Sequence, residues 1–280
     1  MSKDKQTQAD SIDLLLNLNT QLRTQDINEV KSLISEFIDK LKRELANDLD
    51  QIIVYGSLCT GDFDLHLSDV NLLIVTKRDL IETDLFVLSH LHNALKNQYS
   101  IWFERLEVSY ISSQEIYQKT PPKAPRICLS QGKTSRIPYG AQWYFQKYML
   151  RSSGLVLYGG LLDKDKLEVS STNLRVAGFQ ILMDTWQPLT QRAMHHMSPD
   201  LLISGVLTMC RLICTIEEGH VLSKLDAARR VLEAYPSDHS QIIETVIAYR
   251  EKRIPMESID LRACYNFMKY VIEKFLGHDS

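Results

Sequence analysis

Ile52 to Thr76, with the sequence IIVYGSLCTGDFDLHLSDVNLLIVT, is the stretch that decides the fold of the N-terminal half of the chain. Its ends, Ile52–Val54 and Leu72–Val75, are short apolar runs rich in β-branched residues and bounded by turn residues. Runs of this length and composition predict two buried strands. The stretch is therefore predicted to form a strand, a turn, a loop and a second strand.

Four residues between these runs suit a nucleotide site that contains a metal ion. Gly56 and Ser57 form a phosphate-sized turn, and Asp69 and Asn71 alternate along the start of the second strand. Alternating residues of a strand lie on one face of a sheet. Because Mg²⁺ binds hard oxygen ligands and shares them with phosphates, the pattern predicts a magnesium–nucleotide site. The asparagine is unusual there, since its side chain brings no negative charge.

Length and composition indicate a globular protein with two domains. The chain has 280 residues, of which 44% are hydrophobic and 24% charged, as in ordinary soluble proteins. Its formal net charge is −3, and its sequence pI is about 6.2. This balance disfavours a nucleic-acid partner, because such binding needs a basic surface.

The cysteines and the N-terminal residues predict a cytoplasmic protein. The 5 cysteines show neither a C-x-x-C pair nor zinc spacing, and their odd number fits a reducing compartment. The start, MSKDKQTQADS, is polar and lacks the architecture of a signal peptide. No apolar run is expected to approach the length of a membrane span, so no membrane partner is predicted. No feature of the sequence indicates the oligomeric state.

Periodicity separates a part of the chain with strands from a part with helices only. Before residue 165, the patterns predict helices near Asp10–Leu22, Asp26–Asp48 and Asp84–Asn97, a strand at Leu106–Ile111, and an irregular loop with a short edge hairpin over Lys119–Tyr139. The inner face of the third helix is expected to contain Phe86, Leu88, Leu91 and Leu95. After residue 165 only helical patterns follow, which predicts an α/β domain joined to an all-α domain.

Glu107 is the first candidate for a catalytic carboxylate. Alternation in the strand at Leu106–Ile111 places Glu107, Ser109 and Ile111 on one face. A carboxylate on a central strand is costly unless a metal, a cation or a proton-transfer role compensates for its burial. The alternative is an edge-strand residue that faces water. The combination with the Gly-Ser turn and the Asp69–Asn71 pair favours a functional role.

Several segments of the chain together resemble a known enzyme family. The Gly-Ser turn, the D-x-N pair and the later acidic strand resemble the nucleotidyltransferase fold of the polymerase β type. Segments similar to the aminoglycoside 3″-adenylyltransferases are YGSLCTGDFDLHLSDVNLLIV (55–75), RLEVSYI (105–111), WYFQKYMLRSSGLVLYG (143–159) and LTMCRLICTIEEGHVLSKLDAARRVLEAYP (207–236). The resemblance spans about Ile52–Glu273, nearly the whole chain.

The resemblance implies both an architecture and an activity. Residues 1–165 would form a nucleotidyltransferase domain with a mixed β-sheet and helices, and residues 166–280 a C-terminal helical bundle. The activity would be transfer of AMP from ATP, with Mg²⁺, to a hydroxyl of a small, cationic, aminoglycoside-like molecule.

The resemblance also implies roles for single residues around the nucleotide. Gly56, Ser57 and Ser68 would contact the phosphates, and Asp69 and Asn71 would hold Mg²⁺. Glu107 would join the metal ligands and act as the general base that takes a proton from the acceptor hydroxyl.

Two cations of the helical domain, Arg211 and Lys224, would bind the phosphates. Ser223 and Asp226 independently predict that a helix starts at Lys224. A lysine is disfavoured at a helix N-terminus unless an anion is near, whereas the helix end itself attracts phosphate. A solvated lysine is the alternative. For Arg211 the alternative is a salt bridge to one of the two acids at 217 and 218.

For the acceptor, the resemblance implies contacts with Trp143 and Asp200. The alternative for Trp143 is a core aromatic residue at the junction of the two domains. Met197 and Leu201 occupy the positions of the acids that bind streptomycin in characterised family members, and Asp200 is the nearest acid. This departure disfavours streptomycin itself.

Asn71 stands where family members carry aspartate, and three interpretations follow. In the first, the protein is an active adenylyltransferase with a weakened metal site, because Asp69 and Glu107 remain. In the second, it binds nucleotide without catalysis and acts as a sensor or interaction module. In the third, the asparagine comes from an engineered inactive variant.

Overall fold

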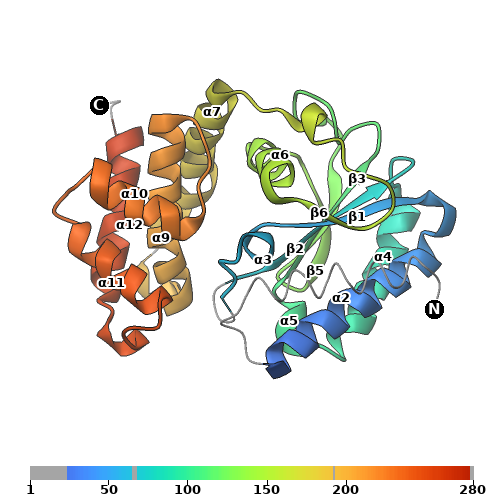
Figure 1. Cartoon of the computed structure of the whole chain (residues 1–280), viewed down its shortest axis with the longest axis horizontal. Helices are drawn as coiled ribbons and strands as arrows, with labels where there is room; N and C mark the ends of the chain where they lie inside the picture. The colour runs from blue at the N-terminus through green and yellow to red at the C-terminus, as the bar shows by residue number, and fades with distance from the viewer. Residues whose placement is uncertain (1–23, 65–67, 192, 278–280) are drawn as a thin grey trace. The chain divides into compact units, whose positions relative to one another are not determined.

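The structure is a computed structural model that describes residues 24–64, 68–191 and 193–277. The predicted helix near Asp10–Leu22 lies outside the described residues. The chain divides into two compact units, Met1–Glu168 and Val169–Ser280. The division falls three residues beyond the predicted boundary at residue 165. Figure 1 shows strands with helices in the first unit and helices alone in the second.

The first unit is built on a mixed sheet, as predicted. Its described strands are β1 (Leu49–Tyr55), β2 (Val70–Thr76), β3 (Leu106–Ser112), β4 (Arg126–Ser130), β5 (Lys133–Ile137) and β6 (Leu155–Tyr158). They lie in the order β5-β4-β3-β2-β1-β6. Only the pairing of β2 with β3 is parallel among these strands, and every other neighbouring pair is antiparallel.

Helices cover the sheet and link its strands. They are α2 (Thr24–Glu44), α3 (Ser57–Thr60), α4 (Glu82–Lys96), α5 (Ser100–Phe103) and α6 (Gln142–Ser153), with short 3₁₀ helices η1 (Ala46–Asp48) and η2 (Lys164–Leu167). The crossover through α4 and α5 returns the chain parallel to β2, as a parallel pair requires.

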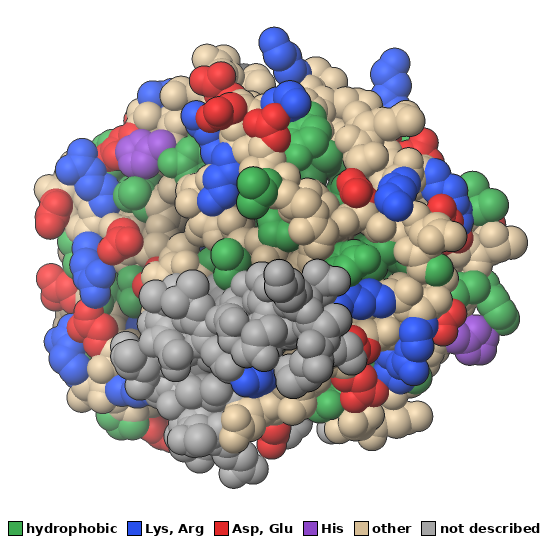
Figure 2. Space-filling model, turned by 45° about the vertical axis from the view of Figure 1, so that its right-hand side comes forward, with side chains coloured by type: hydrophobic (Ala, Val, Ile, Leu, Met, Phe, Trp, Pro, Cys, Tyr) green, Lys and Arg blue, Asp and Glu red, His purple; other side chains and the backbone are tan. Residues whose placement is uncertain are grey.

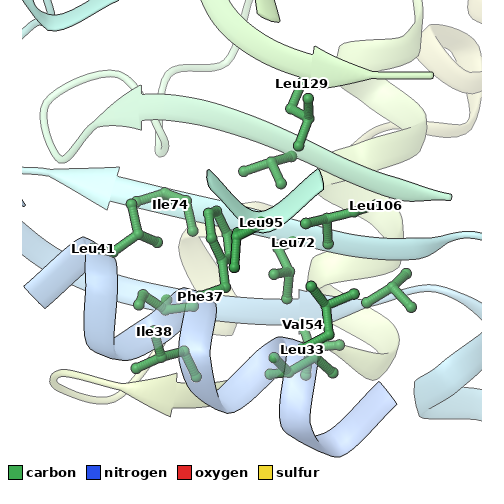
Figure 3. Packing of buried hydrophobic residues seen from close by; sticks show 14 of the residues in the cluster. Leu33, Phe37, Ile38, Leu41, Val54, Leu72, Ile74, Leu95, Leu106 and Leu129 are labelled. Atoms are coloured by element: carbon green, nitrogen blue, oxygen red, sulfur yellow. The ribbon is translucent and has the colours of Figure 1, made fainter. Parts of the chain in front are cut away.

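Two apolar layers form because side chains alternate across the strands. On one face, Leu33, Phe37 and Leu41 of α2 pack onto Val54 and Leu72 (Figure 3). Burial of each such side chain contributes about 1.5–3 kcal/mol relative to exposure. The other face carries Ile53, Tyr55, Leu73 and Ile111, packed with Trp143 and Leu150 of α6. Both sheet faces are therefore buried.

One prediction for α4 is wrong. Leu88, Leu91 and Leu95 are buried as expected, but the side chain of Phe86 is 67% exposed. Successive helical residues are rotated by about 100°, so Phe86, two positions before Leu88, points to the opposite side. Phe86 instead packs edge-on against the ring of His90, with centroids 4.4 Å apart.

The predicted edge hairpin is confirmed. Strands β4 and β5 pair closely enough that Ser130 lies opposite Lys133, which leaves Gln131 and Gly132 as the two turn residues. Their φ angles are +48° and +69°. Two-residue hairpin turns favour positive φ at both positions because this matches the twist of the strands.

The second unit is helical, as predicted. Its described helices are α7 (Ser171–Ile181), the π-helix η3 (Leu182–Trp186), α8 (Gln187–Thr190), η4 (Met194–His196), α9 (Pro199–Glu218), α10 (Lys224–Ala234), α11 (Ser240–Arg250), η5 (Met256–Ser258) and α12 (Leu261–Leu276). Helix α9 packs against α7, α10, α11 and α12. It is the central element of the unit.

Helix α9 corrects the expectation that no apolar run approaches a membrane span. By length and composition, Pro199–Glu218 could cross a membrane. Of its most apolar window, 67% is buried within the protein. The core helix of a soluble protein meets the same criterion, so this is weak evidence for a span.

Candidate active site

The site is organised by a row of three side chains across the middle of the sheet. Tyr55 lies opposite Asn71 in the pairing of β1 with β2. Asn71 in turn lies opposite Glu107 in the pairing of β2 with β3. Directly opposite residues point to the same face of a sheet, so the structure brings the predicted metal ligand and the predicted base together.

The Gly56–Ser57 turn lies against this row. Gly56 has φ +84°, a conformation that glycine adopts without steric cost. A Cβ atom at Gly56 would lie 3.1 Å from Nδ2 of Asn71. Helix α3 begins at Ser57, directly after the turn. Gly56 and Asn71 are therefore neighbours, although 15 positions separate them in the chain.

Ser68 and Asp69 complete the approach to β2. The backbone N–H of Asp64 donates to Oγ of Ser68 at 2.9 Å, and the N–H of Ser68 donates to the carbonyl of Asp64 at 3.0 Å. These bonds make Ser68 a buried anchor of the loop. Asp69 follows with an exposed side chain one residue before the strand. The serine hydroxyl thus already has a structural role beside its predicted contact with phosphate.

The side-chain amide of Asn71 is turned toward the loop. Its Nδ2 donates to the backbone carbonyl of Asp69 at 3.2 Å. An amide has one oxygen that can bind a cation, and it carries no charge. Asn71 can therefore supply an oxygen ligand but cannot replace the electrostatic contribution of an aspartate.

Glu107 is held by the β4–β5 hairpin. Its Oε1 accepts a hydrogen bond from Oγ of Ser130 at 2.8 Å and one from the N–H of Gln131 at 3.3 Å. Burial raises the pKa of Glu107 to about 7, the nearby charge of Asp69 raises it further, and the two hydrogen bonds oppose this rise. A carboxylate with a pKa near 7 suits a general base at neutral pH.

The alternative of a water-facing edge residue does not hold for Glu107. Strand β3 lies between β2 and β4, two strands in from the edge at β5. Glu107 is half-buried on that inner strand. Its ionised form therefore needs the compensation that hydrogen bonds, a proton or a cation provide.

The oxygen atoms of this row fit a magnesium ion. Asp69 and Glu107 provide carboxylates that influence each other electrostatically, and Asn71 provides a carbonyl. Such hard oxygen donors are those that Mg²⁺ takes, usually together with phosphate oxygens and water. Within the described residues, no group of three or more His, Cys, Asp and Glu side chains is placed to hold a metal. A metal here would rely on the amide and the nucleotide.

In the second unit, Lys224 is the first residue of α10, as predicted. The side chain of Ser223 caps the helix by accepting a hydrogen bond from the N–H of Asp226 at 3.2 Å. Nζ of Lys224 donates to Oγ of Ser204 on α9 at 2.9 Å. The ammonium group is therefore directed along α9 at the N-terminal end of α10.

Arg211 lies on α9 two helical turns after Ser204, and hence on the same side of that helix. The acids considered as its alternative partners pair with other cations. Glu218 accepts from Nε of Arg230 at 2.8 Å, and Glu217 lies 3.8 Å from Nζ of Lys274. Both acids therefore have another basic partner in the structure.

The structure places Trp143 in the core rather than on an acceptor. Its side chain is fully buried (0% exposed) and packs with Ile53, Tyr55 and Leu73. The ring of Tyr139 meets it edge-on at 5.4 Å. A residue without exposed surface cannot stack on a substrate in this state. The core alternative therefore describes Trp143, and the predicted substrate contact is corrected.

Asp200 is exposed in the first turn of α9, after the capping residue Ser198 and Pro199. An acid at this position is stabilised by the helix dipole, which gives Asp200 a structural role of its own. Met197, just before the helix, is buried. Asp200 thus remains available to a cationic ligand, whereas Met197 does not.

Four residues at the site were not predicted from the sequence. Tyr55 and Gln146 form one pair, in which Nε2 of Gln146 donates to the tyrosine hydroxyl at 2.9 Å. Burial raises the pKa of Tyr55 to about 12. Ser130 and Gln131 form the other pair, around Glu107. Tyr55 could have been predicted from the sequence because it directly precedes the Gly-Ser turn. No sequence signal marks Ser130 and Gln131.

Comparisons with known proteins agree with this geometry. Residues 186–274 match the family model "Aminoglycoside adenylyltransferase, C-terminal domain". The predicted family resemblance is confirmed. Over these residues the chain is similar to the C-terminal domain of aminoglycoside adenylyltransferases. A comparison with curated protein sequences finds no match.

A solved structure extends the likeness over both units. It is the spectinomycin adenyltransferase AAD(9) from Enterococcus faecialis, crystallised with ATP and spectinomycin. The similarity has a TM-score of 0.63 at 18% sequence identity, and covers 86% of this chain and 98% of the other. At this identity the similarity shows that the two proteins share a fold.

Proposed function

We propose that this adenylyltransferase-like protein is an ATP-dependent nucleotidyltransferase that transfers AMP from ATP to a hydroxyl of a small, aminoglycoside-like molecule. The observation that carries the proposal is the row in which Asn71 and Glu107 lie opposite each other beside the Gly56–Ser57 turn. The similar protein crystallised with ATP and spectinomycin supports the substrate classes. Such a modification would act in antibiotic resistance.

In the proposed reaction, Glu107 takes the proton from the acceptor hydroxyl while that oxygen attacks the α-phosphorus of ATP. The bond from the α-phosphorus to the bridging oxygen breaks, and pyrophosphate leaves. The pKa of about 7 keeps a substantial fraction of Glu107 ionised at neutral pH while leaving it basic enough to accept a proton. Gly56, Ser57 and Ser68 would hold the phosphates.

The metal site would consist of Asp69, Glu107 and the carbonyl oxygen of Asn71. Mg²⁺ supplies neutralisation of phosphate charge, on which transfer of this kind depends. With two carboxylates in place of three, the protein would hold the ion largely through the nucleotide. We therefore expect weak magnesium binding without ATP.

For the second unit, we propose that Lys224 and Arg211 supply phosphate-binding cations. Lys224 occupies the first position of α10, where the helix dipole disfavours a cation but attracts an anion. A bound phosphate would be attracted by both the helix N-terminus and the ammonium group. Asp200 is the proposed contact for a cationic group of the acceptor.

The proposal is tested by incubating the purified protein with Mg-ATP and a panel of aminoglycosides and related alcohols. Pyrophosphate is expected to appear only when an acceptor is present, and the product should gain the mass of one AMP group. The same protein with Glu107→Gln is the matched control. ATP binding without pyrophosphate release across the whole panel would contradict the proposal.

Asn71 favours one second candidate, a nucleotide-binding protein without catalysis. The observation behind it is that the residue brings no charge and that its amide nitrogen bonds to the carbonyl of Asp69. In this case Asn71→Asp would change ATP affinity without creating turnover. Sequencing the source gene decides whether the asparagine is natural or engineered.

A further inference from the structure

The turn of the β4–β5 hairpin donates hydrogen bonds to one carboxylate oxygen of Glu107 and not to the other. Both hydrogen bonds that Glu107 accepts from described residues end on Oε1. One comes from the side chain of Ser130, the last residue of β4, and the other from the backbone of Gln131. Oε2 accepts neither of these hydrogen bonds, so it is the carboxylate oxygen that remains for the acceptor hydroxyl and the proposed metal ion.

Strand pairing fixes this arrangement. Val108 of β3 lies opposite Leu129 of β4. Antiparallel register then brings the end of β4, at Ser130, beside Glu107. The turn is closed by the pairing of Ser130 with Lys133. The two hydrogen bonds from Ser130 and Gln131 to Glu107, called the clamp below, are therefore set by the pairing of strands in the sheet.

The turn also contains a residue in an unfavourable conformation. Gln131 has φ +48°, and a left-handed conformation costs about 1–2 kcal/mol for a residue with a Cβ atom. The two-residue turn favours a positive φ at this position, so the pairing of β4 with β5 compensates for the cost. Here the conformation directs the N–H of Gln131 toward Oε1 of Glu107.

We propose that Ser130, together with the N–H of Gln131, is the positioning element of the general base: it holds Oε1 of Glu107 so that Oε2 meets the acceptor hydroxyl. This inference rests on the proposed function. A carboxylate fixed at one oxygen cannot rotate away from the proton that it must accept. Ser130 itself touches neither substrate nor nucleotide in this scheme.

The test compares Ser130→Ala with Ser130→Thr in the pyrophosphate-release assay. Alanine removes the hydroxyl, and kcat is expected to fall by roughly 10- to 100-fold, the order of loss that small misplacements of reacting groups cause. KM for ATP should change less than twofold, because the phosphates bind elsewhere. Threonine keeps a hydroxyl and should recover most of kcat.

A matched control comes from the same hairpin. Ser135 on β5 lies opposite Cys128, two residues along the hairpin from the Ser130–Lys133 pair, and its hydroxyl is 3.6 Å from the sulfur of Cys128. Ser135→Ala should leave kcat within twofold of the unaltered protein. Thermal unfolding of all three variants identifies any loss of fold, and the comparison of alanine with threonine separates positioning from general destabilisation.

The outcomes are distinct. Active protein in which Ser130→Ala keeps its kcat, or in which Ser130→Thr loses as much as Ser130→Ala, overturns the positioning role and leaves the proposed function intact. Unaltered protein that releases no pyrophosphate with any acceptor overturns the proposed function and this inference with it.

Discussion

The two units differ in the titratable groups that they bury. In the sheet unit, burial raises the pKa of Glu107 to about 7 and lowers the pKa of His92 to about 3. Burial also lowers the pKa of Lys147, whose Nζ donates to the carbonyl of Gln118 at 2.7 Å. Each of these groups is held inside the protein in an environment that opposes its charged form.

Both units have ion pairs at the surface, such as Arg78 with Asp84 in the sheet unit, and many charges of the helical unit lie in pairs of this kind. Arg229 lies 2.7 Å from Glu251, and Arg230 lies 2.8 Å from Glu218. Exposed pairs of this kind contribute about 0–1 kcal/mol each. Charges of both signs are likewise interspersed over the face in Figure 2, which turns the side of Figure 1 with the sheet unit toward the viewer. The buried groups with shifted pKa values, and not the surface charges, therefore distinguish the sheet unit, in which we propose that proton transfer occurs.

The strongest test of this division is Glu107→Gln. The amide keeps an oxygen that can accept from Ser130 but cannot take a proton, so transfer should fall by roughly 10²- to 10⁴-fold. ATP binding, measured by calorimetry, should change little. Unchanged turnover would show that Glu107 is not the base. The difference proposed between the two units would then have no functional meaning.

The second test uses His92 in the core of the sheet unit. Its ring nitrogens contact Oγ1 of Thr134 at 2.7 Å and the hydroxyl of Tyr110 at 2.8 Å. The folded-state pKa of about 3 lies below the ordinary value of 6.5, so the stabilising contribution of the neutral ring is present above pH 6.5 and is lost as the pH falls. Between pH 6.5 and 5 the loss should be about 2 kcal/mol.

Urea unfolding followed by tryptophan fluorescence measures this loss. In His92→Gln, which keeps a donor and an acceptor, the decline between pH 6.5 and 5 should be smaller by the stated amount. His239→Gln in the helical unit is the control and should retain the full decline. Equal slopes for the unaltered protein and His92→Gln would show that the buried ring does not set the acid sensitivity.

The third test restores charge at the sheet site. Asn71→Asp should tighten magnesium binding in the presence of a non-hydrolysable ATP analogue by roughly tenfold, the factor that about 1.4 kcal/mol gives. Turnover should rise in parallel, because more enzyme carries the metal. Calorimetry with Mg²⁺ reports the affinity directly. No change in affinity would place the side chain at position 71 outside the metal site.

The smallest effect is expected in the helical unit. Lys224→Ala should weaken ATP binding about fivefold, which corresponds to about 1 kcal/mol, and added salt should reduce the difference. Lys274→Ala is the matched control, since that lysine lies 3.8 Å from Glu217 in the same unit. Equal effects of the two variants would mean that ATP binding depends on the overall positive charge of the unit and not on the position of Lys224.

Local sequence patterns were sufficient to predict the main helices and strands and some of the residues of the candidate site. The runs around Asn71 predicted both strands, because apolar alternation is a local property of the chain. The wrong expectation for Phe86 arose because a single helix turn offers more apolar residues than its inner face can bury. Trp143 was ambiguous for a similar reason, since an aromatic residue suits a core as well as a ligand.

The clamp on Glu107 could not be predicted in this way. Ser130 follows it by 23 positions, and their contact depends on the register of β3 with β4. Nothing within either segment specifies that register. The pairing of Asn71 with Glu107 is equally non-local, and it was suggested by the combined pattern of these residues and by the family resemblance.

The single parallel pairing described for the sheet also has a consequence for how the protein is made. Asn71 and Glu107 are 36 positions apart, and β2 meets β3 only after the crossover through α4 and α5 has closed. Contacts between distant segments form slowly because the intervening chain must first lose its freedom. A nascent chain emerging from the ribosome therefore cannot pair Asn71 with Glu107 until β3 has been synthesised, so ATP could assist folding through the proposed site only after that point.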